Sequence, residues 1–321
     1  MYESKLVLAV ALVGGGWSTA VAQANSCAVG VTQDACQKAV DLYQYLAPQL
    51  GSAITGGNAT LGQGGALGGL GHFSVGLRVN AVKGSLPQID DLSARPVITG
   101  ARPTAYRIKD APVPMPTIDG ALGIFRGFPL GVTNVGGVDL LLSASYIPKV
   151  NEDDVAIDPD NPLKLGYGAR ISVLQESIVS PGVSVTYLKR DLPVLTLTGE
   201  SLGSTLRVND LDEKTTAWRL VASKSFILFG LAAGYGQDKY ESSAIASATT
   251  GGLASPDVSV SQTMTRSNMF ADLSFNFPIL KIVAEIGQVS GGTAPSTVNT
   301  FPSKGIVDSR LYGSAGIRLS W

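Results

Sequence analysis

The sequence predicts an all-β fold, an antiparallel up-and-down transmembrane β-barrel of about ten strands (roughly 10–12), with a short N-terminal helix and a glycine-rich segment. From residue 72 onward apolar and polar residues alternate with a period of two, so each strand has one apolar face. The connections alternate between short turns and long polar stretches, as in membrane barrels. Charged residues make up only 15% and the mean hydropathy is +0.22, a composition typical of such barrels.

The first 24 residues resemble a secretory signal peptide. Lys5 precedes an apolar run over 6–13, and Ala22-Gln23-Ala24 has the small-x-small form that signal peptidases cleave. We expect the cut before Asn25, with a cut two residues earlier as the alternative. The run is too short to cross a bilayer as a helix. The mature chain then divides into a periplasmic segment, 25–71, and a barrel, 72–321.

The segment before the first strand holds one helix, predicted over 35–50. Apolar residues recur there at intervals of three and four, and Pro48 and Gly51 are expected to end the helix. Residues 55–71 are rich in glycine and predict a compact irregular segment. Two arrangements fit the segment: a plug folded into the lumen, or a periplasmic extension outside the barrel. Cys27 and Cys36 would close a small disulfide loop in an oxidising compartment.

The strands are predicted from the alternating pattern at 73–81, 118–127, 138–146, 165–173, 183–187, 218–222, 227–235, 269–277, 280–286 and 311–321. The fifth could continue through 194–197, and the sixth could begin upstream near 206. Short turns are expected at 128–131, 180–182, 224–225 and 277–278, and long polar connections at 84–116, 149–163, 190–214, 239–266 and 290–309. The six prolines of 84–116 predict mostly loop there. An even strand count places both termini in the periplasm.

A secreted β-sandwich would also alternate in polarity. Its second face would meet water and would carry many Lys, Glu and Thr residues. Here that face is largely Gly, Ser and Ala with isolated charges, and together with the loop asymmetry this favours the barrel.

Isolated charges on the minority face form the candidate site. A charge facing lipid at mid-strand would cost roughly 2–4 kcal/mol, so we expect these side chains to point into the lumen and to pair there. They could form a constriction that selects solutes or a structural network that fills a narrow barrel, and the small interior of about ten strands favours the structural network. The predicted lumen charge network consists of Arg78, Asp119, Asp139, Arg170, Arg219, Asp272, Lys281, Glu285 and Arg318.

Catalytic and metal chemistry find little support in the sequence. His72 is the only histidine, and it lies at the start of the first strand, where an interfacial role is expected. We therefore predict no enzyme, no catalytic residues and no cofactor. Asn151 to Asp154 and Asp158 to Asn161 could offer oxygen ligands to calcium, but neither spacing matches an EF-hand, and no metal site is assigned. A formal net charge of −1 argues against nucleic acid as a partner.

The end of the chain resembles the terminal signature of bacterial outer-membrane β-barrel proteins, in which alternating apolar residues precede a final aromatic residue. The matching positions are Leu311, Ala315, Ile317, Leu319 and Trp321. The resemblance implies a cell outer-membrane location, outer-membrane lipid as the surroundings and recognition by the barrel-assembly machinery. Residues 35–71 also give a looser similarity to outer-membrane long-chain fatty-acid transporters, which place an N-terminal hatch before the first strand.

We therefore expect a monomeric outer-membrane barrel that passes or binds a small, hydrophobic or polar, solute. The alternative is a non-transporting structural or surface-binding barrel that uses its long extracellular loops. In either case the last strand must pair with the first, near Phe73 to Ala81, which would bring Arg78 and Arg318 close together.

Overall fold

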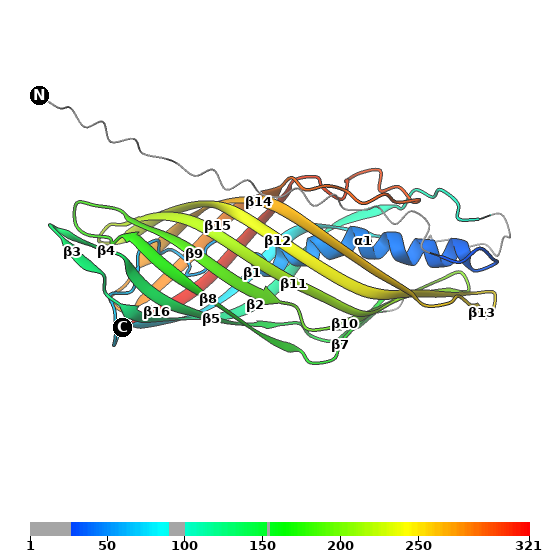
Figure 1. The fold of residues 1–321 in the computed structure, drawn as a ribbon, viewed down its shortest axis with the longest axis horizontal. Coiled ribbons are helices and arrows are strands. Elements are labelled where there is room, and N and C mark those ends of the chain that lie inside the picture. The colour runs from blue at the N-terminus through cyan, green and yellow to red at the C-terminus, as the bar shows by residue number, and fades with distance from the viewer. Residues whose placement is uncertain (1–26, 90–99, 153–154) are drawn as a thin grey trace, which may run out of the picture.

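The computed structural model describes residues 27–89, 100–152 and 155–321. The signal peptide expected at 1–24 and two acidic residues of the 151–161 loop, Asp153 and Asp154, lie outside these residues. Ten long strands form one closed antiparallel barrel (Figure 1), which confirms the predicted fold. The strands are β1 (Phe73–Pro87), β2 (Ile108–Phe125), β5 (Gly137–Tyr146), β8 (Leu163–Leu174), β9 (Gly182–Asp191), β11 (Ser204–Ser225), β12 (Phe229–Thr250), β14 (Val258–Asn276), β15 (Leu280–Ser290) and β16 (Arg310–Ser320).

The barrel closes between its first and last strands, as predicted. β1 and β16 pair from Ser74↔Ser320 to Val82↔Tyr312. The rings of Phe73 and Trp321 stack with their centroids 4.9 Å apart, and the two residues exchange both backbone hydrogen bonds. Both lie at the end of the barrel where neighbouring strands are joined by the turns around 126–136, 175–181, 226–228 and 277–279, which we call the short-turn end. The opposite end, which carries the connections that include 100–107 and 291–309, is the long-connection end.

Short strands supplement the wall. β3 (Phe128–Leu130) and β4 (Thr133–Val135) form a hairpin at the short-turn end. Beyond the last pairing of β11 with β9, the N-terminal half of β11 pairs with β10 (Leu195–Ser201), which pairs with β7 (Val155–Pro159) and through it with β6 (Val150–Glu152). β13 (Leu253–Ala254) lies in the turn between β12 and β14.

The wall is taller than the sequence predicted. The stretches 190–214 and 239–266, expected as long connections, are mostly strand, because β11, β12 and β14 extend through them. Only the upstream extension of the sixth strand to about residue 206, which the sequence also allowed, agrees with β11. Residues still alternate between the two faces there, but the apolar residues now face inward and the polar residues outward. Tyr240, Ala244 and Ala246 are buried inside, while Lys239 and Glu241 are exposed outside. The outward face loses its apolar residues, and with them the signal on which the strand prediction depended.

The proline-rich stretch 84–116 was likewise expected to be mostly loop, but β1 continues to Pro87 and β2 begins at Ile108. Pro112, Pro114 and Pro116 occupy alternate positions of β2, so their missing N–H groups all lie on one side of the strand. β1 pairs with this part of β2 on one side, and the ladder with β5 begins only at Thr117. The prolines thus occupy an edge, where no ladder needs their N–H groups.

The helix α1 (Gln33–Thr55) also extends past its predicted end at residue 50. Pro48 cannot donate to the carbonyl of Gln44, which would break most helices. Here the side chain of Gln262 on β14 donates to that carbonyl at 3.3 Å, so the lost partner is replaced from the wall. In the described part of the chain, no helix is both long and apolar enough to cross a membrane.

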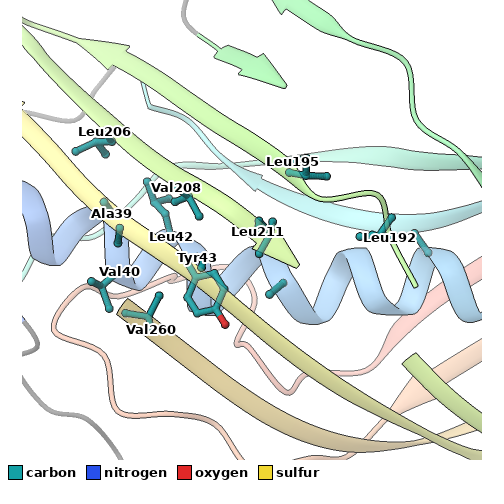
Figure 2. Close-up of a cluster of buried hydrophobic side chains, with 14 of the residues drawn as sticks. Ala39, Val40, Leu42, Tyr43, Leu192, Leu195, Leu206, Val208, Leu211 and Val260 are labelled. Atoms are coloured by element: carbon teal, nitrogen blue, oxygen red, sulfur yellow. The ribbon is translucent and has the colours of Figure 1, made fainter. Parts of the chain in front are cut away.

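Inside the barrel, α1 runs along the axis from the long-connection end toward the middle (Figure 1), and nearly all its residues are buried, polar ones included. Of the two arrangements left open by the sequence, the structure has the segment inside the lumen. An apolar cluster joins the helix to the wall: Leu42 and Tyr43 of α1 lie beside Val208 and Leu211 of β11 (Figure 2). Residues 56–71 continue from the helix to the short-turn end, where β1 begins.

One glycine allows the helix to lie this close to the wall. A Cβ atom on Gly51 would lie 2.7 Å from Oε1 of Glu213 and 2.8 Å from Cδ1 of Tyr240, both on buried residues of the wall. We predict that Gly51→Ala lowers the free energy of unfolding by about 1–3 kcal/mol through overpacking. Urea titration of the detergent-solubilised protein measures this. Gly313→Ala is the control, because its Cβ would meet only a backbone oxygen at 3.6 Å; equal effects of the two substitutions would contradict the tight fit.

Candidate functional site

The C-terminal end of α1 is held by arginines of the barrel wall. Arg190 donates to the carbonyl of Thr55 at 3.0 Å, Arg219 to that of Gly56 at 3.1 Å, and Arg78 to that of Asn58 at 2.8 Å. The last carbonyls of a helix have no partner within the helix and carry the negative end of its dipole. Because the last turn of α1 has no basic residue of its own, the wall supplies both the hydrogen bonds and the positive charge.

The same arginines are paired with carboxylates in the wall. Asp119 bridges two of them, with 2.9 Å to Nε of Arg78 and 2.6 Å to an Nη of Arg190. Arg219 pairs with Asp238 at 2.5 Å, and in the neighbouring part of the wall Arg170 pairs with Asp139 at 2.7 Å. The charged side chains of these pairs are almost fully buried. Pairing is what makes such burial tolerable, since a lone buried charge would cost several kcal/mol.

Carboxylates bind the chain that follows the helix. Glu285 accepts from the amides of Gly57 and Asn58 at 3.1 and 2.7 Å. Asp272 accepts from the amide of Gly62 at 2.9 Å and from the side chain of Asn58, and Asp139 accepts from the amide of Leu67 at 3.1 Å. Cationic groups of the wall therefore bind the carbonyls of this segment, and anionic groups bind its amides.

The N-terminal half of α1 is bound to the connections of the long-connection end. Asp34 accepts from the amide of Arg102 and forms an ion pair with Lys38 at 2.7 Å. Asp41 accepts from the amides of Val298 and Asn299 at 3.1 and 2.6 Å. Burial raises the pKa of the Asp41 carboxyl above its usual value, and hydrogen bonds from Gln37 and Asn299 partly offset this rise. These contacts fold the two connections over the end of the helix.

Cys27 and Cys36 form a disulfide at the same end, and both cysteines are buried. The bond joins the residues that precede α1 to its first turn. It therefore fixes the chain at the point where it enters the barrel.

Most residues of the predicted lumen charge network point inward and contact either one another or the segment 56–71. Arg318 donates to the carbonyl of Leu61 and lines one small internal void together with Arg78. Lys281 differs, because it is only half-buried and its nearest hydrogen-bond partner is Ser225 at 3.4 Å, near the short-turn end. The arrangement is that of a structural network rather than of an open constriction.

Several partners in this network were missed from the sequence. Arg190 and Asp238 complete two of the ion pairs, and Asn268 donates to the carbonyl of Gly56. Arg190 continues the inward series of Ser184, Thr186 and Leu188, so the alternation of the fifth strand, carried three residues further, would have included it.

An apolar cavity of about 320 Å³ lies between α1 and the wall near the long-connection end. The helix contributes Leu42, Leu46 and Leu50 to its lining, and almost all of the exposed lining surface is apolar. The opposite sides come from β1, β2, β7, β10 and β11, with Leu86, Pro112, Val113, Pro114, Val155, Ile157, Leu197, Leu206 and Val208. No pattern in the sequence indicates this cavity, because its lining comes from elements that are distant along the chain.

The remaining candidates have ordinary surroundings. In the acidic 151–161 loop, Asp158 pairs with Lys149 at 2.6 Å, and Asn161 accepts from the amide of Leu163. No cluster of three or more potential metal-ligating His, Cys, Asp or Glu residues occurs among the described residues. His72 is exposed just before β1, where it was expected.

Comparisons with known proteins give only weak structural matches. No family profile and no curated protein sequence matches it. Among solved structures, a TodX mutant (deltaS2S3), titled a monoaromatic hydrocarbon channel, aligns with a TM-score of 0.31 and 10% identity over 78% of this chain and 89% of that chain. The Ralstonia pickettii toluene transporter TbuX aligns with a TM-score of 0.30 and 11% identity over 84% and 92%. OmpT, an outer membrane protein of Vibrio cholerae, aligns with a TM-score of 0.21 and 12% identity over 84% and 99%.

Of these three proteins, OmpT is described as an outer membrane protein. At such low scores the likeness carries no information on cargo. The prediction that the chain is not an enzyme is wrong, because it excluded catalysis for a fold that is not limited to channels. Among the matched structures, OmpT is described only as an outer membrane protein and not as a channel. The barrel fold therefore does not rule out catalysis.

Substitution of one wall arginine tests how strongly the wall stabilises the C-terminal end of α1. We predict that Arg219→Gln lowers the free energy of unfolding by about 3–5 kcal/mol, because it leaves Asp238 buried without its ion-pair partner and removes donors from the end of α1. Urea unfolding and limited proteolysis of the 27–71 segment measure this. The control is Lys83→Gln, which breaks an exposed pair with Asp110 and should change the free energy of unfolding little, because solvent screens that pair. If Arg219→Gln lowers the free energy of unfolding no more than the control does, the wall arginines do not stabilise the helix end.

Proposed function

We propose that this chain is an outer-membrane barrel that binds a small apolar solute in the cavity beside α1 and passes it along the barrel. The membrane location is supported by the outer surface of the wall. Large apolar side chains such as Leu77, Ile171, Leu231 and Ile317 stand about half exposed on four strands around the barrel. Their charged neighbours Arg78, Arg170 and Arg318 are buried inside. A soluble protein would not leave such a continuous apolar surface in water.

The apolar cavity is the observation that carries the binding proposal. Ligand sites are concave and mostly apolar, with few polar groups to fix orientation, and Gln49 is the one polar side chain of the lining that comes from α1. In another protein an apolar cavity of roughly 150 Å³ binds benzene, so this larger space suits a molecule of the size of toluene or somewhat above. The lumen charges do not compete for this role, because all of them except Lys281 are bound to one another or to the segment 56–71.

A break in the wall supports access to the cavity. Residues 108–116 of β2 have no ladder partner on the side away from β1, and β6 pairs only with β7 among the described strands. The cavity lies between this part of β2 and the strands β7 and β10, whose side chains line it. Passage beyond the cavity requires α1 or the segment 56–71 to move, since both fill the lumen.

A substitution that fills the cavity tests binding. We predict that Leu46→Trp abolishes the saturable binding of radiolabelled toluene in equilibrium dialysis of the detergent-solubilised protein, because the larger side chain occupies the space. Leu220→Trp adds the same ring to the outer surface of β11 and should leave binding unchanged. Toluene that dissolves in the detergent micelles contributes equally to all three proteins, so it cancels when their binding is compared. Equal uptake by the wild type and Leu46→Trp would rule out this cavity as the site.

The alternative, a non-transporting barrel that binds other molecules through its loops, predicts a different result in transport assays. The filled lumen predicts no steady small-ion conductance of the full chain in planar bilayers under either proposal. In a transport assay the protein is held in a membrane, loaded with toluene from one side, and the release of toluene to acceptor vesicles is measured on the other side. This release should occur only if the solute passes through the protein. Its absence, with binding retained, would leave a binding barrel.

A further inference from the structure

The turns at the short-turn end are unusually apolar for segments expected to lie in water. In the turn between β8 and β9, Ile178 is 96% exposed and Val179 is 73% exposed. In the turn between β11 and β12, Ile227 is 93% exposed and Leu228 is 71% exposed. The remaining turns at this end repeat the pattern, with Phe128, Leu130, Val132, Phe277 and Ile279 all more than half exposed. The turns therefore form one apolar surface that none of the residues described by the structure covers.

Aromatic side chains mark the other boundary of the apolar outer surface on this side of the barrel. Tyr187, Trp218 and Tyr235 lie on β9, β11 and β12 and are each about half exposed, and the last two rings meet edge to face at 6.2 Å. Toward the long-connection end, the next outward positions on these strands are polar: Lys189, Thr216 and Gln237. Tyrosine and tryptophan gather at the interface between lipid and water, so this row marks one edge of the membrane.

The strands below this row are too short to fill a membrane. From Tyr235 to Phe229, and from Trp218 to Ser225, a strand rising ~3.3 Å per residue at a tilt of ~40° covers only ~15–18 Å. The apolar band of an outer-membrane barrel is ~25 Å tall. The missing height is about that of the turns, and the apolar strand surface runs without interruption into them through Phe229 and Phe226.

The backbone of these turns is also prepared for surroundings without water. Lys224 directs its ammonium group to the carbonyls of Ser177, Ile178 and Ser180 at 2.5, 2.8 and 3.3 Å. Glu176 accepts from the amide of Ser225 at 2.5 Å. The side-chain amide of Asn276 donates to the carbonyl of Phe226 at 3.1 Å, and its backbone amide donates to the carbonyl of Leu228 at 2.8 Å. In lipid each unsatisfied backbone group costs several kcal/mol, and the polar side chains near these turns are used to satisfy such groups.

We propose that the short-turn end is submerged in the bilayer, with the turns 175–181 and 225–229 inside the apolar layer and in contact with lipid acyl chains. This inference rests on the proposed membrane function. It sets the height of the protein in the membrane: the row of Tyr187, Trp218 and Tyr235 lies at the far interface, and the upper halves of β11, β12 and β14 stand beyond it.

The test measures depth at single positions. The only two cysteines of the chain form the disulfide, so a new cysteine is the only free thiol. Ile178→Cys and Ile227→Cys, each carrying a nitroxide, are reconstituted in phosphatidylcholine liposomes, and collisions with oxygen and with a water-soluble nickel chelate are recorded by electron paramagnetic resonance. Leu220→Cys serves as the position within the lipid-facing wall, and Leu202→Cys, 76% exposed at the opposite end, as the position in water.

We expect the ratio of oxygen to nickel collisions at both turns to match that at Leu220 and to exceed that at Leu202 several-fold. If Leu220 is in lipid while both turns are readily reached by nickel, this inference is wrong, and the apolar turns are then available to a protein partner. If Leu220 itself is reached by nickel as readily as Leu202, the proposed membrane function fails as well. The two failures are thus distinguished by one position.

Discussion

The interior of this barrel depends on how the wall binds the backbone of its own N-terminal segment. A helix that ends inside a protein leaves carbonyls without partners, and the turn that follows leaves amides. Arginines of the wall take the carbonyls of Thr55, Gly56 and Asn58, and the carboxylates of Asp272 and Glu285 take the amides of Gly57, Asn58 and Gly62. A pore with these charges exposed would select ions. Here these charges bind the segment inside the barrel, which leaves the apolar cavity as the place where we propose that a solute binds.

The strands could be predicted because ten stretches alternate in polarity, but their lengths could not. Beyond Trp218 and Tyr235 the outward residues turn polar while the inward residues pack on α1, so a search for apolar outward faces stops too early. The helix was cut short for a comparable reason. Pro48 ends helices unless something replaces its hydrogen bond, and the replacement, Gln262, lies more than two hundred residues away.

The candidate site shows the same division. The alternation of polar and apolar residues predicted which charged side chains face inward. In the structure most of these side chains are buried inside the barrel, and Lys281 is half-buried. The alternation could not tell which charges pair, because pairing depends on the register between strands. Asp119 is shared by Arg78 and Arg190, and Arg190 lies on a strand that is not hydrogen-bonded to β2. The cavity was beyond prediction altogether, since no local pattern indicates that Leu46 would face Val113 and Leu197.

The direction of α1 has a consequence for how the protein is made. The helix begins at the long-connection end, yet the chain leaves it to start β1 at the short-turn end, where Phe73 meets Trp321. The seam between β1 and β16 therefore joins the first and last strands of the barrel, which are more than two hundred residues apart in sequence, the slowest kind of contact to form. The apolar face of α1 is covered, and the carbonyls at its C-terminal end are hydrogen-bonded, only by the surrounding wall. We therefore expect the helix to become stable at the same stage as the seam between β1 and β16. The barrel of this protein should therefore close while its wall packs on the N-terminal segment, rather than form first and receive the segment afterwards.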